Sequence, residues 1–298
     1  MAAPHHPPHD HASWGTPPLG AAGRLTDASR REALALARTG AVFDLSHVID
    51  AGAPFMAPNQ TPFLLSTWAS WRDSIRRRRA GGFRNDAGSN LERIEMTTHV
   101  GTHIDALGHF SIGDRLYGGE DAAEVVGDWG LARLGIEHIP PLITRGVLID
   151  VAGLDGGDFL PPGRVVTPAE LAARCPVPLA PGDVALIRTG WGRWFGLDNR
   201  RYLEGEPGID VPGARWLTGQ GVVAIGADNM AVEVLPNPDH GLALPVHQHA
   251  LAEAGVHLIE NLVLDELAAA GVTVFCFVLL AVKFRGATGS PARPVALV

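Results

Sequence analysis

The sequence predicts a single α/β domain with many short strands and few helices. Three observations support this fold class. Short apolar segments bounded by Gly, Pro or Asn recur along the chain, helical patterns are few, and no repeat of fixed period is visible. The 298 residues, 46% hydrophobic and 19% charged, are also enough for one large core.

The N-terminal residues differ from the rest in composition. Residues 1–12 are rich in Pro and His, which is typical of a disordered tail, so the folded domain is expected over residues 13–298. The tail histidines can bind metal adventitiously, and they are His5, His6, His9 and His11. Any metal assay must therefore separate the tail from the domain.

Helix and strand patterns follow one another through the domain. Thr26 or Asp27 can cap a first helix, which Gly40 would end. Thr167-Pro168 opens another helix, because Pro suits the first helical position. The expected helices lie at 26–38, at 167–175 and up to Gly255, and the expected strands at 42–48, 91–96, 146–153, 182–192, 221–229 and 271–284.

Composition excludes several classes of partner. The formal net charge of −8 argues against nucleic acid, and no apolar stretch is long enough for a membrane span. Two cysteines, Cys175 and Cys276, cannot form a disulfide framework, so a cytoplasmic location is expected. The one basic run, 76–79, is interpreted as a solvated loop or helix end, with anion contact as the alternative.

A dense group of metal-binding residue types lies at 98–110, THVGTHIDALGHF. Its members are His99, His103, Asp105 and His109. Imidazole and carboxylate together suit zinc, manganese or iron. A helical HExxH arrangement is excluded, because Val100 follows the first histidine and Gly101-Thr102 is a poor helix interior.

The spacing of these residues requires the chain to curl. In a straight strand the Cα atoms of His99 and Asp105 would lie about 20 Å apart, whereas metal–nitrogen bonds are about 2.0–2.1 Å. We therefore expect a bend at Gly101. Three protein ligands are usual in catalytic sites, which predicts His99, His103 and Asp105 as ligands. His109 is then a further ligand or a general acid–base group.

Two later regions carry weaker signals. In 245–262, PVHQHALAEAGVHLIENL, either His247 or Gln248 begins a helix, and Glu260 ends the following strand, so both positions can face the cluster. Asp228 and Glu233, in GADNMAVE, are candidates for contacts to substrate or to the metal ligands, or are plain loop residues. Spacing alone does not choose among these alternatives.

A family resemblance adds to these observations. The segment HVGTHIDALGH resembles the His-x-Gly-Thr-His-x-Asp-x-x-x-His signature of the cyclase family of metal-dependent hydrolases, which includes bacterial kynurenine formamidase and isatin hydrolase. Other segments resemble family blocks in the same order, so the resemblance covers about residues 13–298. These segments are VFDLSH, IRTGWG, IGADNMAVEVLP, VHQ with GVHLIENL, and GATGSPARP.

The resemblance implies a fold and a set of ligands. It implies a swivelling β/β/α domain assembled as a homodimer or homotetramer, with a divalent metal, Mn or Zn, on His99, His103 and Asp105. His109 would handle protons. In two-metal formamidases a later His and Glu hold a second ion with the aspartate bridging. Glu260 matches that Glu, and the His corresponds best to His247 within the run His247-Gln248-His249. Isatin-hydrolase-like members hold one manganese ion, so one or two ions per chain are expected.

The implied activity is hydrolysis of an amide or lactam bond in a small, aromatic substrate. The metal would lower the pKa of a bound water from about 15.7 toward roughly 7, and His109 would take its proton and return it to the leaving nitrogen. One alternative is a cyclase or dehydratase of natural-product biosynthesis that uses the same ion as a Lewis acid. Another is a non-catalytic binding module in which the metal only stabilises the fold.

Overall fold

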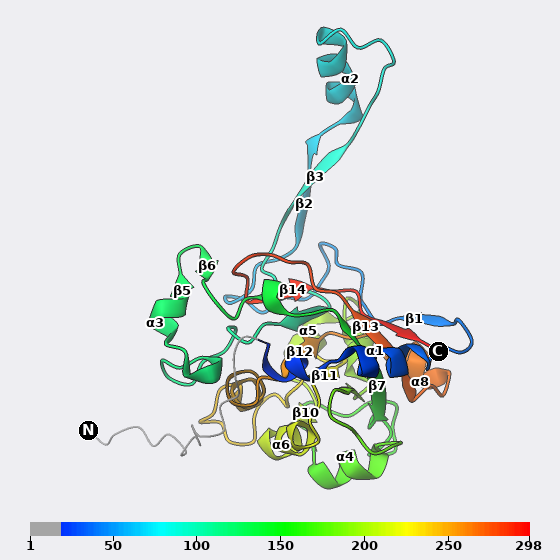
Figure 1. The fold of residues 1–298 in the computed structure, drawn as a ribbon, viewed down its shortest axis with the longest axis vertical. Coiled ribbons are helices and arrows are strands. Elements are labelled where there is room, and N and C mark those ends of the chain that lie inside the picture. Colours follow the sequence, from blue (N-terminus) through cyan, green and yellow to red (C-terminus); the bar gives the residue numbers. More distant parts are fainter. Residues whose placement is uncertain (1–18) are drawn as a thin grey trace.

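The computed structural model describes residues 19–298, so the expected tail over residues 1–12 lies outside the described residues. A nine-stranded mixed sheet runs through the body (Figure 1). In order across the sheet its strands are β1 (Val42–Asp44), β15 (Val295–Leu297), β13 (Val274–Leu279), β7 (Leu142–Asp150), β9 (Val184–Arg188), β11 (Ala224–Ala227), β12 (His257–Glu260), β4 (His103–Asp105) and β14 (Gly289–Pro291). This arrangement confirms the predicted α/β class.

The middle of the sheet forms the core. Strands β7, β9, β11 and β12 are parallel, and the remaining neighbours in this sheet pair antiparallel. Strands β9 and β11 are nearly continuous apolar runs and are buried along almost their whole length, as expected for parallel strands covered on both faces. Helix α1 (Asp27–Leu34) packs on β7 and β13, and α4 (Pro168–Arg174) packs on β7 and on α6 (Val211–Gly219).

Shorter elements complete the body. Two small sheets pair β8 (Val165–Val166) with β10 (Gly208–Ile209) and β5 (Val126–Gly127) with β6 (Gly130–Leu131). The other helices of the body are α3 (Ala122–Val125), α5 (Asn199–Leu203), α7 (Pro245–His247), α8 (Asp265–Ala269), the 3-10 helices η2 (Gly20–Arg24), η3 (Tyr117–Gly119), η4 (Ile136–His138) and η5 (Trp191–Trp194), and the π-helix η6 (Gln248–Glu253). Among the described residues, no helix combines the length and the hydropathy needed to cross a bilayer.

The predicted helix starts agree with the structure better than the predicted ends. The Thr26 side chain caps α1, and Thr167 caps α4 with Glu170 completing the capping box. Helix α1 ends at Leu34, four residues before the predicted end at residue 38. The helix predicted up to Gly255 is split into α7 and the wider turns of η6, and most predicted strands are shorter than expected.

One segment projects away from the body. We call residues 61–97 the arm: among residues 19–298, β2 (Leu64–Ala69) pairs only with β3 (Leu91–Glu95), and α2 (Trp71–Ala80) forms the tip (Figure 1). The Ser70 side chain caps α2, and the basic run 76–79 lies in its last turns. The expectation of a helix end for this run is therefore confirmed.

Candidate metal centre

Strand β4 places the histidine cluster inside the sheet. It lies between β12 and β14, and the register pairs His103 with Glu260 and Asp105 with Gly289. Cross-strand partners in an antiparallel pair lie about 4.5–5.5 Å apart. The register therefore brings Glu260 to the cluster from 151 or more positions along the chain, which sequence spacing alone cannot predict.

The predicted bend is present at Gly101. Its φ of +70° is a left-handed conformation, and a Cβ there would lie 2.5 Å from Cγ1 of Ile49. The Gly101 carbonyl accepts a hydrogen bond from Asn261 Nδ2 at 3.1 Å and lies 2.8 Å from His103 Nδ1. The bend thus also orients the His103 ring, leaving its Nε2 to face the cluster.

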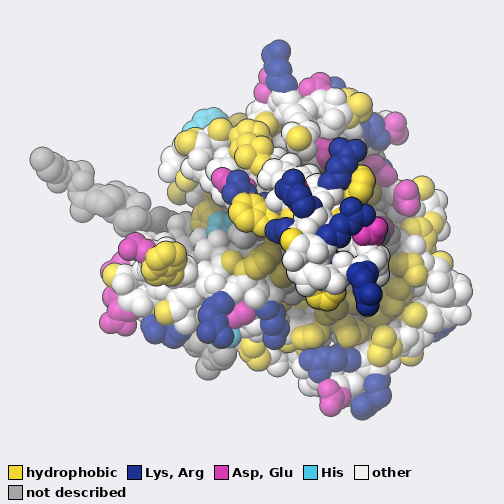
Figure 2. Space-filling view, turned by 90° about the horizontal axis from the view of Figure 1, so that it is seen from above, with side chains coloured by type: hydrophobic (Ala, Val, Ile, Leu, Met, Phe, Trp, Pro, Cys, Tyr) yellow, Lys and Arg dark blue, Asp and Glu magenta, His cyan; other side chains and the backbone are white. Residues whose placement is uncertain are grey.

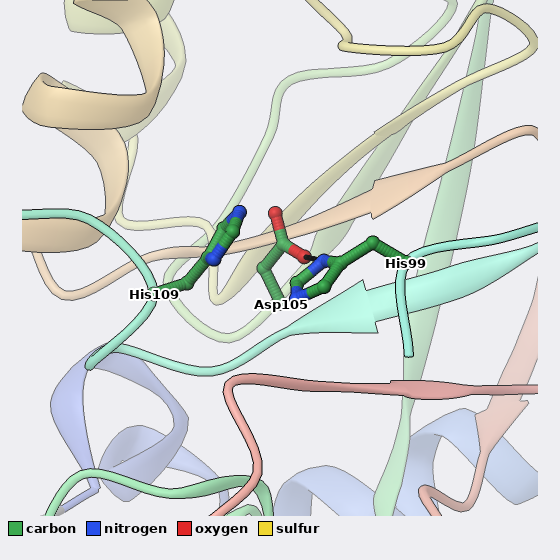
Figure 3. Close-up of side chains that lie close together, drawn as sticks. All are labelled: His99, Asp105 and His109. Atoms are coloured by element: carbon green, nitrogen blue, oxygen red, sulfur yellow. Dashed lines mark ion pairs between the residues drawn. The ribbon is translucent and has the colours of Figure 1, made fainter. Parts of the chain in front are cut away.

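The two oxygens of Asp105 face different histidines. Asp105 Oδ1 lies 2.8 Å from His99 Nδ1 and 3.5 Å from His103 Nε2. Asp105 Oδ2 lies 3.8 Å from His247 Nε2. The side chains of His99, Asp105 and His109 point toward one another (Figure 3), and the His99 and His109 rings stack with centroids 4.0 Å apart.

Glu260 connects the remaining two histidines. Its Oε2 lies 3.1 Å from His103 Nε2, and its Oε1 lies 3.0 Å from His247 Nε2. Two sets of possible ligand atoms therefore share Asp105, each with its atoms within 4.8 Å of one another. One set is His99, Asp105 and His109, and the other is His103, Asp105 and Glu260.

These residues fit a divalent cation. Both carboxylate oxygens of Asp105 and Nε2 of His103 are buried without a hydrogen-bond partner among the described residues. A buried charge or polar group without a partner is costly, so these atoms require a cation or a proton between them. Imidazole and carboxylate are donors for both zinc and manganese.

Burial and nearby charges shift the pKa values of three histidines of the cluster in different directions. Burial lowers the pKa of His109 to about 3, although the Asp105 charge opposes this. Burial also opposes protonation of His103, but the Glu260 and Asp105 carboxylates prevail and raise its pKa to about 9. The pKa of His247 is raised too, since Glu233 and Glu260 outweigh its burial. The histidines hold the pKa of Asp105 well below its usual range despite burial.

The structure distinguishes the three neighbours in the run 247–249. Only His247 reaches the cluster, and Glu233 orients it. The Glu233 carboxylate accepts hydrogen bonds from the backbone N–H groups of Val246 and His247, and its Oε1 lies 2.7 Å from His247 Nδ1. Gln248 Nε2 donates to the Ser111 carbonyl, and His249 lies 2.7 Å from Glu253 instead. Glu233 therefore acts on a candidate ligand and not on substrate directly.

Asp228 lies apart from the cluster. Its Oδ1 accepts hydrogen bonds from the Thr189 backbone and hydroxyl, and its Oδ2 accepts one from the Gly190 backbone. Burial raises its pKa to about 6 even with these donors. This arrangement favours the loop-residue alternative for Asp228.

A cavity of about 730 Å³ opens onto the cluster. His99, His109, His247 and Glu260 line it together with apolar side chains and residues at the two roots of the arm. The apolar lining includes Met56, Met96, Phe110, Met230, Leu235 and Leu244. A small molecule in this cavity would contact the candidate metal ligands directly.

Sequence reasoning missed three residues that shape the site. Thr288 Oγ1 lies 2.9 Å from His99 Nε2 and thereby orients that ring. A Cβ at Gly289 would lie 2.5 Å from His99 Cε1, so only glycine fits beside the ring. Asn261, at φ +56°, holds the Gly101 bend. The only sequence signal for Thr288 and Gly289 was the Gly-rich segment GATGSP, because glycine permits close approach of the backbone to a side chain.

Comparison with known proteins identifies the family. The family model named Cyclase matches residues 43–234 of this chain. The chain belongs to the cyclase family. This cyclase-family chain is 32% identical to a solved structure described as a novel cyclase, with a TM-score of 0.82 over 94% of this chain and 95% of that one.

Two further relatives carry functional names. The kynurenine formamidase of Geobacillus thermodenitrificans is 27% identical over 253 residues, which are 84% of this chain and 94% of that protein. Isatin hydrolase A of Labrenzia aggregata shares the fold, with a TM-score of 0.63 and 21% identity over 87% of this chain and 93% of that one. The resemblance inferred from the histidine signature is confirmed.

Proposed function

We propose that this metal-dependent amide-bond hydrolase acts on a small aromatic amide or lactam, such as an aryl formamide or an isatin-like ring. The enzyme class follows from family membership and from relatives named kynurenine formamidase. One observation supports the substrate class: three histidines and Glu260 of the candidate metal centre line the same cavity as methionine, leucine and phenylalanine side chains.

The cavity matches this substrate in size and polarity. Ligand sites are commonly about 300–1,000 Å³, mostly apolar, with a few converging polar groups. The volume of about 730 Å³ falls within this range. An aromatic ring would lie against Met56, Met96 or Phe110, while its amide carbonyl faces His99 and His109.

The residues of the candidate metal centre have different roles. His99, His103 and Asp105 would hold the ion, with His247 and Glu260 placed for a second ion or for orienting the first. When bound, the metal supplies Lewis acidity, which acidifies water and polarises a carbonyl. Glu233 and Thr288 keep His247 and His99 turned toward the centre.

His109 is the candidate general base. With a pKa of about 3 its ring is neutral at pH 7, and it lines the cavity beside His99. A neutral imidazole accepts a proton from the attacking water and returns it to the leaving nitrogen. His109 also lies in one of the two possible ligand sets, so a role as ligand is the alternative that mutation distinguishes.

A cyclase or dehydratase activity is the second candidate. The 32% identity to a solved structure described as a novel cyclase supports this second candidate. The same ion and His109 would serve an intramolecular reaction without consumption of water. The third interpretation, a non-catalytic module, is not retained, since the formamidase relatives are enzymes.

The test is a substrate panel. Full-length protein loaded with manganese or with zinc is incubated with an aryl formamide, with isatin and with an aryl ester, and products are followed by mass spectrometry. We expect release of formate or addition of one water to the lactam, absent in Asp105→Ala. A folded, metal-loaded protein that turns over neither the formamide nor isatin would contradict the proposal. The domain limits of 13–298, the cytoplasmic location and the homodimer or homotetramer stay predictions.

A further inference from the structure

The hydroxyl of Tyr202 lies at the end of a hydrogen-bond chain that leads to the candidate metal centre. Tyr202 belongs to α5 and is fully buried, at 0% exposure. Its hydroxyl donates to Asn261 Oδ1 at 2.7 Å, and Asn261 Nδ2 donates to the Gly101 carbonyl at 3.1 Å. The same carbonyl lies 2.8 Å from His103 Nδ1. Three short contacts therefore join a side chain outside the cluster to a candidate metal ligand.

The direction of each hydrogen bond in this chain follows from its acceptors. The Gly101 carbonyl can only accept, so it receives protons from Asn261 Nδ2 and from His103 Nδ1. Asn261 must then present its Oδ1 to Tyr202, whose hydroxyl is the donor. Burial raises the pKa of Tyr202 well above its usual range, so this hydroxyl keeps its proton. A neutral His103 with its proton on Nδ1 offers the lone pair of Nε2 to a metal.

The Tyr202 hydroxyl decides which way the Asn261 amide faces. Among residues 19–298 it is the one hydrogen-bond donor to Asn261 Oδ1. The oxygen and nitrogen ends of an amide have nearly the same shape, so packing alone does not fix their orientation. Without the hydroxyl, Oδ1 is left buried without a donor, which is costly, and a reversed amide would set Oδ1 against the Gly101 carbonyl oxygen. The carbonyl that orients the His103 ring would then lose its second donor.

Packing around α5 holds Tyr202 in one orientation. Trp191 Nε1 donates to the Tyr202 carbonyl at 3.3 Å, and the Phe195 ring meets the Tyr202 ring edge to face, with centroids 5.6 Å apart. Phe195 stacks in turn on His47, with ring centroids 3.9 Å apart. A phenol fixed through both its backbone and its ring is suited to hold a partner side chain in a defined position.

The link from Tyr202 to the Gly101 bend is built from neutral groups, namely a hydroxyl, an amide and a carbonyl. Figure 2 shows Lys and Arg side chains on the surface of the end that carries the arm, whereas Tyr202 and Asn261 are 0% and 4% exposed. Salt screens interactions between exposed charges, but it has little effect on hydrogen bonds between buried neutral groups. The contribution of Tyr202 should therefore not depend on ionic strength.

We propose that Tyr202 is a positioning residue for the candidate metal ligand His103, and that it acts through Asn261 and the Gly101 carbonyl. Groups that orient a metal-binding histidine through its other ring nitrogen typically contribute about 10–100-fold to metal affinity. Tyr202 extends this support by one further side chain, to a helix in which the sequence indicated no site residue. The role rests on the metal-binding part of the proposed function and is independent of the proposed substrate.

The test measures the affinity of the full chain for cobalt(II), by competition with a chelator and by the visible absorption of the bound ion. Tyr202→Phe removes only the hydroxyl. Tyr117→Phe is the matched control, because Tyr117 is the chain's other tyrosine, is 2% exposed and packs against Gly255. Asn261→Gly removes the amide, and glycine readily adopts the φ of +56° found at Asn261. The double variant asks whether Tyr202 acts through Asn261.

We expect Tyr202→Phe to lower the affinity for cobalt about 10–100-fold and to shift the visible spectrum, at low and at high salt alike, while Tyr117→Phe binds like wild type. Asn261→Gly should lose at least as much, and adding Tyr202→Phe to it should cause no further loss.

Equal affinity of wild type and Tyr202→Phe overturns the role of Tyr202, and so do losses that add in the double variant. A fall only in the Tm of the metal-free protein would likewise overturn it, because it would show a purely structural hydroxyl. A wild type that binds no cobalt contradicts the metal centre itself, and the role of Tyr202 falls with it.

Discussion

The two sides of Asp105 differ in exposure and in their contacts with carboxylates. On the His109 side, which comprises His99 and His109, burial lowers the pKa of His109 and outweighs the opposing charges of Asp105 and Glu260. On the Glu260 side, which comprises His103, His247 and Glu260, carboxylates raise the pKa of both histidines. A neutral His109 suits proton transfer, whereas the Glu260 carboxylate on the other side suits retention of a cation, which would displace the protons of His103 and His247. The difference teaches that a close carboxylate reverses the effect of burial on the pKa of a histidine, and His109 lacks such a contact with Glu260 or Glu233.

Removal of Asp105 should have the largest effect, because both sides depend on it. We expect Asp105→Ala to lose the metal and to lower turnover by at least about 10³-fold, since metal and electrostatic stabilisation disappear together. Metal content and kcat are measured on the same preparation. Asp228→Asn, which changes another buried aspartate away from the cluster, should keep its metal. Full activity of Asp105→Ala would refute the whole site assignment.

His109→Ala separates the two sides. Because His109 is assigned to proton transfer, kcat should fall by about 10²–10⁴-fold while metal content stays at the wild-type level. The measurement is elemental analysis beside steady-state kinetics. Loss of metal together with activity would make His109 a ligand and remove the proposed distinction between the sides.

Gly289→Ala tests the position of His99 without changing any ionisable group. The added Cβ would lie 2.5 Å from the imidazole, so the ring must move. A misplacement of about 1 Å at a reacting group can cost about 10²-fold in rate, and we expect a loss of that order in kcat/KM. Gly219→Ala is the matched control, because nothing lies within 4 Å of its Cβ. Equal activity of the two variants would show that His99 needs no fixed position.

Glu233→Gln probes the Glu260 side and should have the smallest effect. The carboxylate orients His247, and loss of such a partner typically costs about 10–100-fold in metal affinity. Glu206→Gln is the control, since Glu206 is equally buried and accepts two backbone N–H groups but contacts no histidine of the cluster. Metal affinity is measured by competition with a chelator. An equal loss in both variants would indicate general disturbance and not orientation of His247.

The sequence predicted the parts of the site that are local in the chain. The four residues of 99–109 and the bend at Gly101 follow from spacing, because a metal cannot be shared along a straight strand. The sequence identified Glu260 and His247 as candidates but did not predict where they lie relative to the cluster, since their position depends on the pairing of β12 with β4. Thr288 and Gly289 were missed, because β14 reaches β4 from the far end of the chain.

The same limit applies to the fold. The α/β class, the helix starts at Thr26 and Thr167 and the strands of the core were predictable, because capping and apolar runs are local properties. The order of the nine strands was not, since it is set by contacts between distant segments. In the arm the strand at 91–96 was predicted and corresponds to β3, whereas β2 was not predicted, because a strand exposed on both faces lacks the alternation that marks a half-buried strand.

Anomalous diffraction from crystals grown with manganese or zinc tests the central claim most directly. The account predicts an ion within about 2.0–2.3 Å of an Asp105 oxygen and of nitrogens of His99 and His103, with the His109 ring nearby but not bound. Ions found only elsewhere, for example on the histidines of residues 1–12, would contradict the assignment of Asp105 as the centre of the site.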